Sequence, residues 1–155
     1  MKIKITEFVT LLLVALVMGV FWGTWFTLTR SLPDFSAAEF IHIGKTIIAN
    51  VGAPMSVIMP LTLLMMLITI WLNYRTNRSS FYLYSVSFLL MVVTLIITVA
   101  VEVPIDNKIN EWTEATVPDN WQSLRHTWDQ FHTARTFTSI GSLGFFVAGL
   151  IKKIK

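Results

Sequence analysis

Residues 101–135 read VEVPIDNKINEWTEATVPDNWQSLRHTWDQFHTAR and form a polar stretch within an otherwise apolar chain. Six of the nine acidic residues and two of the three histidines lie in residues 102–135, which we call the polar island. Long apolar segments flank the polar island on both sides, and segments of that kind belong in a lipid bilayer. We therefore expect any binding or chemistry to be located in the polar island.

The composition of the 155-residue chain indicates an integral membrane protein. Hydrophobic residues make up 54% of the chain and charged residues 14%, and the mean hydropathy is +0.65, which exceeds what soluble domains show. The length suits a single domain over residues 1–155. The absence of cysteine excludes disulfides, thiolate catalysis and cysteine-ligated metals. The cations lie at the ends of apolar segments, so nucleic acid is not an expected partner.

Four apolar segments define the predicted membrane spans. A helix of about 20 residues, at about 1.5 Å per residue, crosses a hydrocarbon core of about 30 Å. The predicted spans are residues 8–28, 55–72, 81–101 and 130–151. The last apolar run is too short to cross alone, so its helix is expected to begin within the polar island, near Asn120. The predicted fold is an all-α, four-helix membrane bundle with a polar cap, outside the cytoplasm, between helices three and four.

Two local patterns refine the region before the second span. Ser36 and Glu39 have the spacing of a capping box, which predicts a helix that starts near Ala37. Residues 50–54 read NVGAP, which predicts a break or a kink before the span itself. Between these two signals, apolar residues recur at helical spacing. They are Phe40, Ile43, Ile47 and Val51.

The first span contains a G-x-x-x-G pattern formed by Gly19 and Gly23. Small residues at this spacing allow two membrane helices to approach closely. The pattern therefore predicts helix packing on this face of the first span.

The distribution of charge predicts the orientation in the membrane. Seven cations lie on the side that holds the two termini and the connection between spans two and three, with Glu7 the one acid near them. They are Lys2, Lys4, Arg75, Arg78, Lys152, Lys153 and Lys155. The other two loops hold five cations and eight acids. The positive-inside rule then places both termini in the cytoplasm and the polar island outside.

Five residues of the polar island recur at steps of four, three, four and three, which places them on one face of a helix. They are Trp121, Arg125, Trp128, His132 and Arg135. Helix lengths place Arg135 just inside the outer membrane boundary and Glu102 just outside it, so we expect the two side chains to meet. A charge at this depth is either functional or part of a structural ion pair, and both interpretations stay open.

The ionisable residues of the outer side suggest two kinds of chemistry. Glu102, Asp106, His132 and His42 are ligand types for iron, manganese or zinc. No His-x-x-x-His or Glu-x-x-His pair supports a metal site, and Pro104 is expected to disrupt the helical relation between Glu102 and Asp106. Alternatively, a histidine beside a carboxylate is suited to proton transfer. The sequence does not decide between a metal, another cofactor and no cofactor.

The aromatic and amide residues have two interpretations. Trp121 and Trp128 are typical of interfacial anchors. They also suit an aromatic wall beside a ligand, with Arg125 stacked on the rings. Asn107 either orders its loop or presents its amide to a ligand, and His42 comes from the other outer loop.

These motifs resemble the anthrone oxygenase-like family of small four-span membrane proteins. The resemblance rests on VEVPIDNKINEW, followed by W-x3-R-x2-W-x3-H-x2-R before the last span, and on FIHIGKTIIANVGAPMSVIMPLTLL in the second segment. It implies a mostly bacterial family, hence the inner membrane, and a fungal branch that oxidises anthrones to anthraquinones without a conventional cofactor. The family's Asn-x-Pro-x-Asn motif has carboxylates here. The motif positions correspond to Glu102, Pro104, Asp106, Trp128, His132 and Arg135.

The function that we expect is oxidoreductase-like chemistry on a small apolar, phenolic or quinone-like molecule. In this hypothesis His132, aided by Glu102 or Asp106, takes a proton from the ligand. Arg125 and Arg135 stabilise the resulting anion. The alternative is a non-catalytic protein, either an accessory subunit of a larger membrane complex or a lipid-binding protein. Whether the protein is an enzyme therefore stays open at this point.

Overall fold

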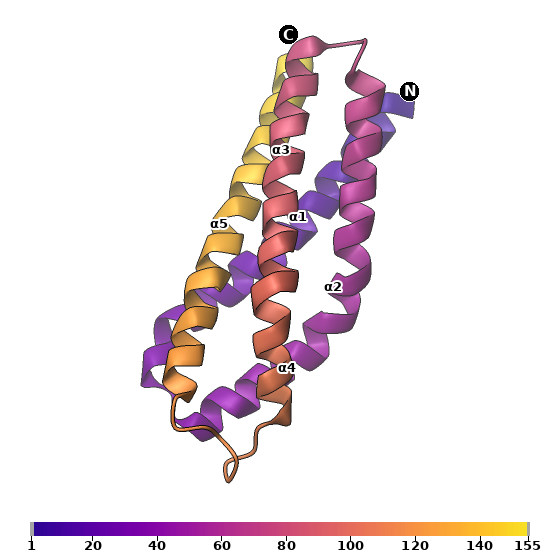
Figure 1. The fold of residues 1–155 in the computed structure, drawn as a ribbon. Helices are drawn as coiled ribbons and strands as arrows, with labels where there is room; N and C mark the ends of the chain where they lie inside the picture. The colour runs from indigo at the N-terminus through magenta and orange to yellow at the C-terminus, as the bar shows by residue number, and fades with distance from the viewer. Residues whose placement is uncertain (1, 155) are drawn as a thin grey trace.

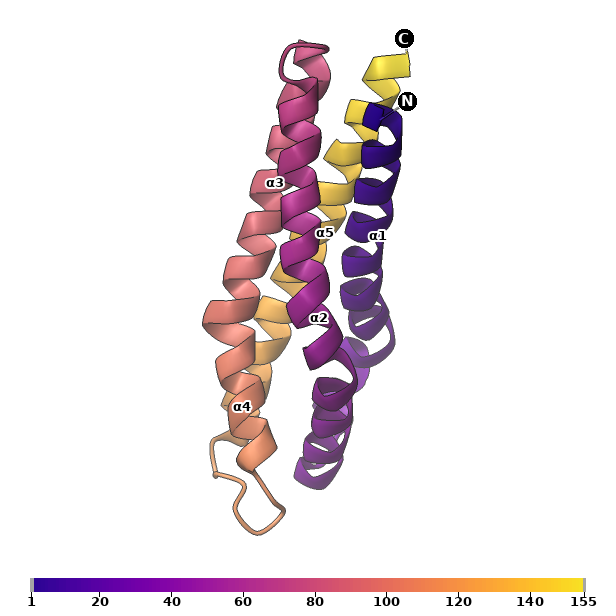
Figure 2. The same ribbon diagram turned by 90° about the vertical axis from the view of Figure 1, so that its right-hand side faces the viewer.

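Long helices run the length of the molecule in the computed structural model, which describes residues 2–154 (Figure 1). The elements are α1 (Lys2–Leu28), the 3-10 helix η1 (Thr29–Asp34), α2 (Ala37–Asn73), α3 (Arg78–Ile97), the π-helix η2 (Thr98–Glu102), α4 (Val103–Glu111) and α5 (Trp121–Ile154). Figures 1 and 2 show both ends of the chain at one end of the bundle and the loop between α4 and α5 at the other. No strand occurs in residues 2–154. The predicted all-α bundle is confirmed.

Four helices have the length and composition of membrane spans. They cover Ile3–Leu28, Ala37–Asn73, Arg78–Glu111 and Trp121–Lys153. Their outward faces carry large apolar side chains, such as Trp71, which is 75% exposed, and Val57, which is 66% exposed. An apolar surface of this extent is unfavourable in water and favourable in lipid. The chain is therefore an integral membrane protein.

Helix α2 begins where the capping box predicts. The Ser36 backbone N–H donates to Glu39 Oε2 over 2.8 Å, and the Glu39 N–H donates to Ser36 Oγ over 3.4 Å. The segment at residues 50–54 is a kink and does not break the helix, because α2 continues through Pro54 and Pro60 to its end. Figure 1 shows the bend in the lower half of α2. A proline inside a helix removes one hydrogen bond and displaces the preceding turn, so the axis bends.

The helix of the third span does not end at Pro104. A π-helical turn joins α3 to α4, with the Val103 N–H bonded to the carbonyl of Thr98. Pro104 lies in the first turn of α4, where a missing N–H is tolerated. The expectation that Pro104 disrupts the helical relation between Glu102 and Asp106 is therefore wrong.

The inward face of the third span continues across the π-helical turn. The buried residues of α3 include Tyr84, Ser87 and Met91. Five turns later, at about 3.6 residues per turn, the third span again buries three residues, which are Glu102, Ile105 and Ile109. One face of the continuous rod α3–η2–α4 therefore points into the bundle along its length.

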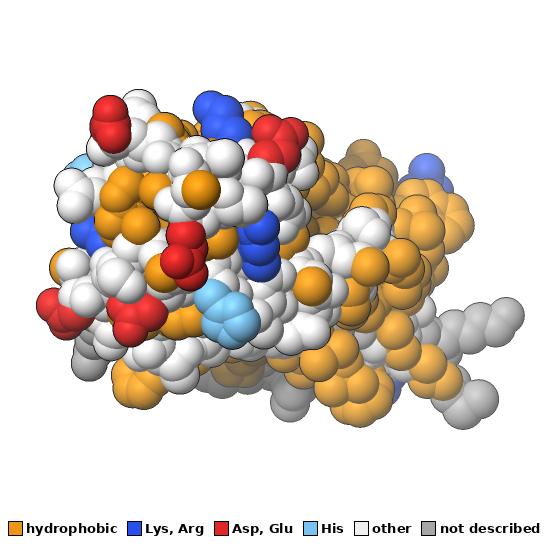
Figure 3. Space-filling model, turned by 90° about the horizontal axis from the view of Figure 1, so that it is seen from below, with side chains coloured by type: hydrophobic (Ala, Val, Ile, Leu, Met, Phe, Trp, Pro, Cys, Tyr) orange, Lys and Arg blue, Asp and Glu red, His pale blue; other side chains and the backbone are white. Residues whose placement is uncertain are grey.

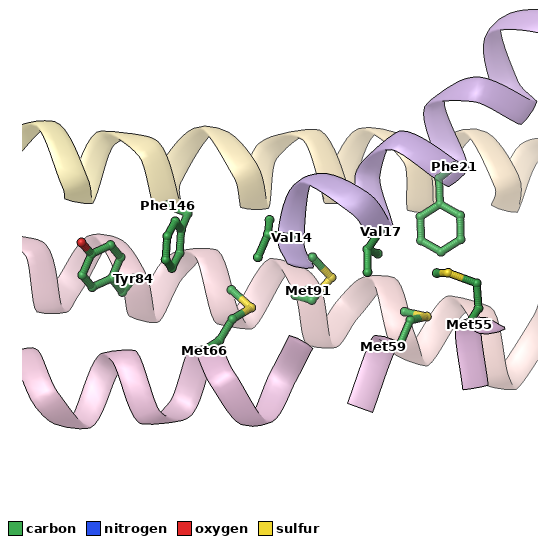
Figure 4. Packing of buried hydrophobic residues seen from close by; sticks show 9 residues of the cluster. All are labelled: Val14, Val17, Phe21, Met55, Met59, Met66, Tyr84, Met91 and Phe146. Carbon is green, nitrogen blue, oxygen red and sulfur yellow. The ribbon is translucent and has the colours of Figure 1, made fainter. Parts of the chain in front are cut away.

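The four spans meet in an apolar core (Figure 4). Its buried members are Val14, Val17, Phe21, Met55, Met59, Met66, Tyr84, Met91 and Phe146. Hydroxyl groups also join α3 to α5, which pack together along their length. Ser87 Oγ donates to the Ser142 carbonyl over 2.7 Å, and Ser142 Oγ donates to the Ser87 carbonyl over 2.8 Å. These contacts fix the position of α5 along the bundle axis relative to α3, and with it the positions of the side chains that α5 carries.

A buried polar group that we call the Glu7 cluster joins the helices at the end with the termini. Glu7 Oε1 accepts hydrogen bonds from Asn73 Nδ2 (3.1 Å), the Tyr84 hydroxyl (3.1 Å) and Lys153 Nζ (2.7 Å). Lys153 Nζ also donates to Asn73 Oδ1 over 2.9 Å. One carboxylate thus connects α1, α2, α3 and α5. In the sequence Glu7 stands only as the one acid among cations, and no local pattern predicts this cluster.

The G-x-x-x-G pattern of α1 does not pack against another helix. A Cβ atom built on Gly19 or on Gly23 would have no heavy atom within 4 Å beyond its own helix and chain neighbours. The predicted helix packing at this pattern is therefore wrong.

A close approach does occur at Gly149, where a Cβ atom would lie 2.5 Å from Tyr84 Cε1 and 2.8 Å from Tyr84 Cδ1. The Tyr84 ring is 1% exposed, so it has little room to move. We expect Gly149→Ala to lower the free energy of unfolding by about 1–3 kcal/mol through overpacking. Gly144→Ala is the control, since no atom lies within 4 Å there, and alanine should stabilise this helix by about 0.5–1 kcal/mol. Unfolding in detergent measures both, and equal effects would contradict the close contact.

Candidate functional site

An apolar cavity of about 350 Å³ lies between the helices. Most of its wall comes from α1 and α2, and the face of α2 that the sequence analysis described supplies Phe40, Ile43, Ile47 and Val51. α4 and α5 add the ionisable side chains Asp106, His132 and Arg135, together with Trp128. A largely apolar wall with a few polar groups is typical of sites for small molecules, and the volume lies at the lower end of their usual range.

Three buried side chains of α5 form a column along the cavity. The Trp128 and His132 rings stack with their centroids 4.7 Å apart and their planes at 3°. On the other side of the imidazole, Arg135 Nη2 and Nε lie 2.9 and 3.2 Å from His132 Nδ1. A guanidinium group can only donate, so Nδ1 accepts and the imidazole carries its proton on Nε2. His132 is therefore neutral in this arrangement, with one defined tautomer.

The proton-bearing nitrogen of His132 has no acceptor in good hydrogen-bond geometry. Nε2 is buried and unpaired by that criterion among residues 2–154, and the Phe21 backbone beside it is at most a weak acceptor. The His132 side chain is 1% exposed and lines the cavity. A buried donor without an acceptor is unfavourable by about 1–3 kcal/mol. An oxygen atom of a molecule in the cavity would supply the missing acceptor.

The predicted contact between Glu102 and Arg135 is confirmed. Arg135 Nη2 lies 2.9 Å from Glu102 Oε2, and the carboxylate is fully buried. The contact is an ion pair without hydrogen-bond geometry, so neither Glu102 oxygen accepts a hydrogen bond from the described residues. The Arg135 guanidinium also lies over the Phe21 ring, with Cζ 4.7 Å from its centroid. Arg135 is thus held by a carboxylate, an imidazole and an aromatic face.

Asp106 is the carboxylate that reaches the cavity. Its Oδ1 accepts a hydrogen bond from Trp128 Nε1 over 3.2 Å, and its side chain is part of the cavity wall. Glu102 lies one turn earlier and pairs with Arg135 instead. The two carboxylates therefore have different positions. Asp106 orients the Trp128 indole beside the cavity. Glu102 balances the charge of the Arg135 guanidinium and is not part of the cavity wall.

The Glu7 cluster shows what a satisfied buried ion pair looks like in this chain. Both sites pair a buried glutamate with a cation of α5 over less than 3 Å. In the Glu7 cluster three donors share the carboxylate oxygen, whereas Glu102 and His132 Nε2 are left without hydrogen-bond partners. Buried polar groups left without hydrogen-bond partners in a native structure require an explanation, and of these two residues only His132 lines the cavity.

The residues that α2, α4 and α5 contribute to this site fall within a region that characterises one family. The sequence pattern of a family described as anthrone oxygenase matches residues 40–145, from the first turns of α2 into α5. The chain belongs to the anthrone oxygenase family. The resemblance stated from the VEVPIDNKINEW segment is therefore confirmed. Comparisons with curated proteins and with solved structures gave no match.

In this anthrone oxygenase family member, Trp121 and Arg125 lie outside the cavity wall. Arg125 Cζ is 5.0 Å from the Trp121 ring centroid, so the expected stacking is present. Arg125 Nη1 donates to the Leu32 carbonyl over 2.7 Å and to the Phe35 carbonyl over 3.4 Å. Trp121 packs on Phe40, with centroids 5.7 Å apart. These contacts fasten the start of α5 to η1 and α2.

The structure does not bring His42 and Asn107 to the other predicted site residues. Both side chains are exposed and neither belongs to the cavity wall. In the described part of the chain, no group of three histidine or acidic side chains is placed to hold a metal ion. Seen from the end that carries the loop before α5, the surface shows scattered acidic, basic and histidine side chains (Figure 3).

Sequence reasoning missed the contribution of α1 to this site. Phe21 contacts Arg135, and Val20, Thr24 and Leu28 line the cavity. These residues lie in a span that is apolar on all sides. Nothing in the local sequence therefore distinguishes the residues that face the bundle from those that face lipid. Thr24, a polar residue at four-residue spacing from Val20 and Leu28, is the one signal that the sequence offers.

Proposed function

We propose that this member of the anthrone oxygenase family is an oxidoreductase. Its substrate is a small apolar molecule with a phenolic or carbonyl oxygen, bound in the cavity, and its oxidant is dioxygen. The observation that carries the proposal is the unpartnered Nε2–H of His132 in an apolar cavity. An anthrone, which is planar, apolar and has one carbonyl oxygen, fits this description.

In the proposal His132 acts as a hydrogen-bond donor to the substrate oxygen. Arg135 occupies Nδ1, so the imidazole offers Nε2–H and has no free lone pair for accepting a proton. This arrangement favours the role of donor over the role of base that the sequence analysis gave to His132. When the substrate loses a proton, negative charge develops on its oxygen, and a fixed donor beside a guanidinium stabilises that charge.

Asp106 is the base of the proposal, because it is the carboxylate in the cavity wall. It removes a proton from the methylene carbon that is conjugated with the carbonyl group, which leaves an electron-rich anion. The anion transfers electrons to dioxygen and forms a carbon–oxygen bond. Loss of the second proton from the same carbon and cleavage of the O–O bond complete the reaction. In balance, the methylene group and one molecule of dioxygen give a carbonyl group and one molecule of water.

The orientation in the membrane is part of the proposal. We propose a plasma-membrane protein, in bacteria the inner membrane, that folds as one domain with both termini in the cytoplasm. Seven cations in the sequence segments at the two termini and between spans two and three, with Glu7 as the one acid near them, support this orientation. The proposed site then lies toward the outer side.

Binding of anthraquinone, followed by quenching of tryptophan fluorescence in detergent, tests the role of His132. We expect His132→Phe to weaken binding about 5- to 100-fold, since a buried hydrogen bond of about 1–3 kcal/mol is lost while an aromatic ring remains to stack on Trp128. His126→Phe is the matched control, because His126 is exposed on the same helix and contacts Gln130.

Oxygen consumption with anthrone as substrate tests the reaction. Asp106→Asn should abolish turnover and leave anthraquinone affinity nearly unchanged. Equal affinity in wild type, His132→Phe and His126→Phe would contradict the proposed site. Binding that depends on His132 without oxygen consumption would instead favour a non-catalytic lipid-binding or accessory protein.

A further inference from the structure

We infer that apolar ligands enter the cavity sideways from the bilayer, through an entry site in the groove between α1 and α2. This inference rests on the proposed function, because it concerns how the substrate of that cavity arrives. The entry site is formed by the face of α1 that carries the G-x-x-x-G pattern. It would take planar, uncharged molecules that are dissolved in the hydrocarbon region.

Two adjacent ridges of α1 make up one wall of this groove. Gly19, Gly23 and Thr27 recur every four residues and form the exposed outer ridge. Residues 20, 24 and 28, each one position later, form the inner ridge and are half-buried. Positions four apart lie above one another on a helix, so the two ridges run side by side.

The inner ridge belongs to the groove and to the cavity alike. Val20, Thr24 and Leu28 line both, and from α2 so do Ile47 and Val51. The groove therefore shares its inner wall with the cavity that holds His132.

The glycines keep the mouth of the groove open. No heavy atom outside the helix and its chain neighbours would contact a Cβ atom at Gly19 or Gly23. Gly44, Gly141 and Gly149, in contrast, are closely packed. Small residues in a membrane helix ordinarily serve close packing. Here they leave space beside a cavity, and the unpartnered Nε2 of His132 indicates that this cavity receives a ligand.

The surface of the groove suits an apolar occupant. The hydroxyl groups of Thr24 and Thr27 donate to the carbonyls of Val20 and Gly23, over 3.2 and 2.6 Å. With their hydroxyls satisfied by their own helix, both threonines can present methyl groups. A substrate that partitions into lipid would thus pass from hydrocarbon to an apolar groove and then to the cavity, without crossing the charged end of the bundle.

Binding kinetics in phosphatidylcholine nanodiscs test the entry site. Anthraquinone is dissolved in the lipid, and its binding is followed by stopped-flow measurement of tryptophan quenching. The amounts of anthraquinone are chosen so that the association rate of the wild type rises linearly with the ratio of anthraquinone to lipid. Gly23→Leu and, as a second variant, Gly19→Leu fill the mouth of the groove. Gly144→Leu is the control, since Gly144 is equally open and lies on neither the groove nor the cavity.

We expect Gly23→Leu and Gly19→Leu to slow association and dissociation by the same factor, about tenfold or more, as blockage of an access route does. The equilibrium affinity should stay close to that of the wild type, because neither residue touches the cavity. Unchanged or faster association in both variants would overturn the entry site. If the wild type shows no saturable quenching, the proposed function fails, and this route with it.

Discussion

Arg135→Ala is expected to lower the free energy of unfolding by about 3–5 kcal/mol, because it leaves a buried carboxylate without its counter-charge. Glu102 is fully buried and accepts no hydrogen bond from the described residues, so Arg135 is its compensating group. The same change removes the donor to His132 Nδ1 and the cation over the Phe21 ring. Thermal or chemical unfolding in detergent measures the effect.

The double variant Arg135→Ala with Glu102→Gln should recover much of that stability, since the neutral amide needs no counter-charge. Arg125→Ala provides a control from the same helix, because Arg125 is only half-buried and donates to backbone carbonyls. Additive losses in the double variant would show that Arg135 stabilises the bundle through His132 and Phe21 and not through Glu102.

Glu7→Ala is the second change with a large expected effect, a loss of about 2–4 kcal/mol, because it leaves the buried amide of Asn73 and hydroxyl of Tyr84 without an acceptor. The Lys153 side chain is 21% exposed, so its charge can reach water and adds less. Glu7→Gln should be much milder, a loss of about 1 kcal/mol, since the amide oxygen can still accept hydrogen bonds from the two buried donors, Asn73 and Tyr84.

Unfolding in detergent again provides the measurement for this pair. The exposed residue Glu114 supplies the control, and Glu114→Ala is expected to stay within about 0.5 kcal/mol of the wild type. If Glu7→Gln is as damaging as Glu7→Ala, the charge of Glu7 matters more than its three hydrogen bonds, and the cluster is primarily an ion pair.

Much of the fold follows from local sequence signals. The capping box at Ser36 fixes the start of α2, and the shortness of the last apolar run places the start of α5 within the polar island. The contact between Glu102 and Arg135 follows from helix rise and membrane thickness alone. Each of these three predictions depends only on the number of residues along a helix, which can be counted in the sequence.

Features that depend on how helices face one another could not be obtained in this way. The Glu7 cluster requires the rotation of four helices to be known together. The lining of the cavity by α1 likewise depends on the rotation of a helix that is apolar on all sides.

The predicted site was also larger than the cavity. Trp121 and Arg135 share a helix face, but they are separated by about 21 Å along the axis at 1.5 Å per residue. One small molecule does not span that distance. Trp128, His132 and Arg135 therefore adjoin the cavity, whereas Trp121 and Arg125 hold the end of α5 in place.

The continuous rod formed by α3, η2 and α4 makes chain length part of how this segment encodes the site. Each residue added to or removed from a helix rotates everything beyond it by about 100°. A substitution along this rod alters one contact, but an insertion or deletion between Thr94 and Glu102 would turn Glu102 away from Arg135 and Asp106 away from the cavity together. The number of residues in the rod thus sets the angle at which both carboxylates face α5.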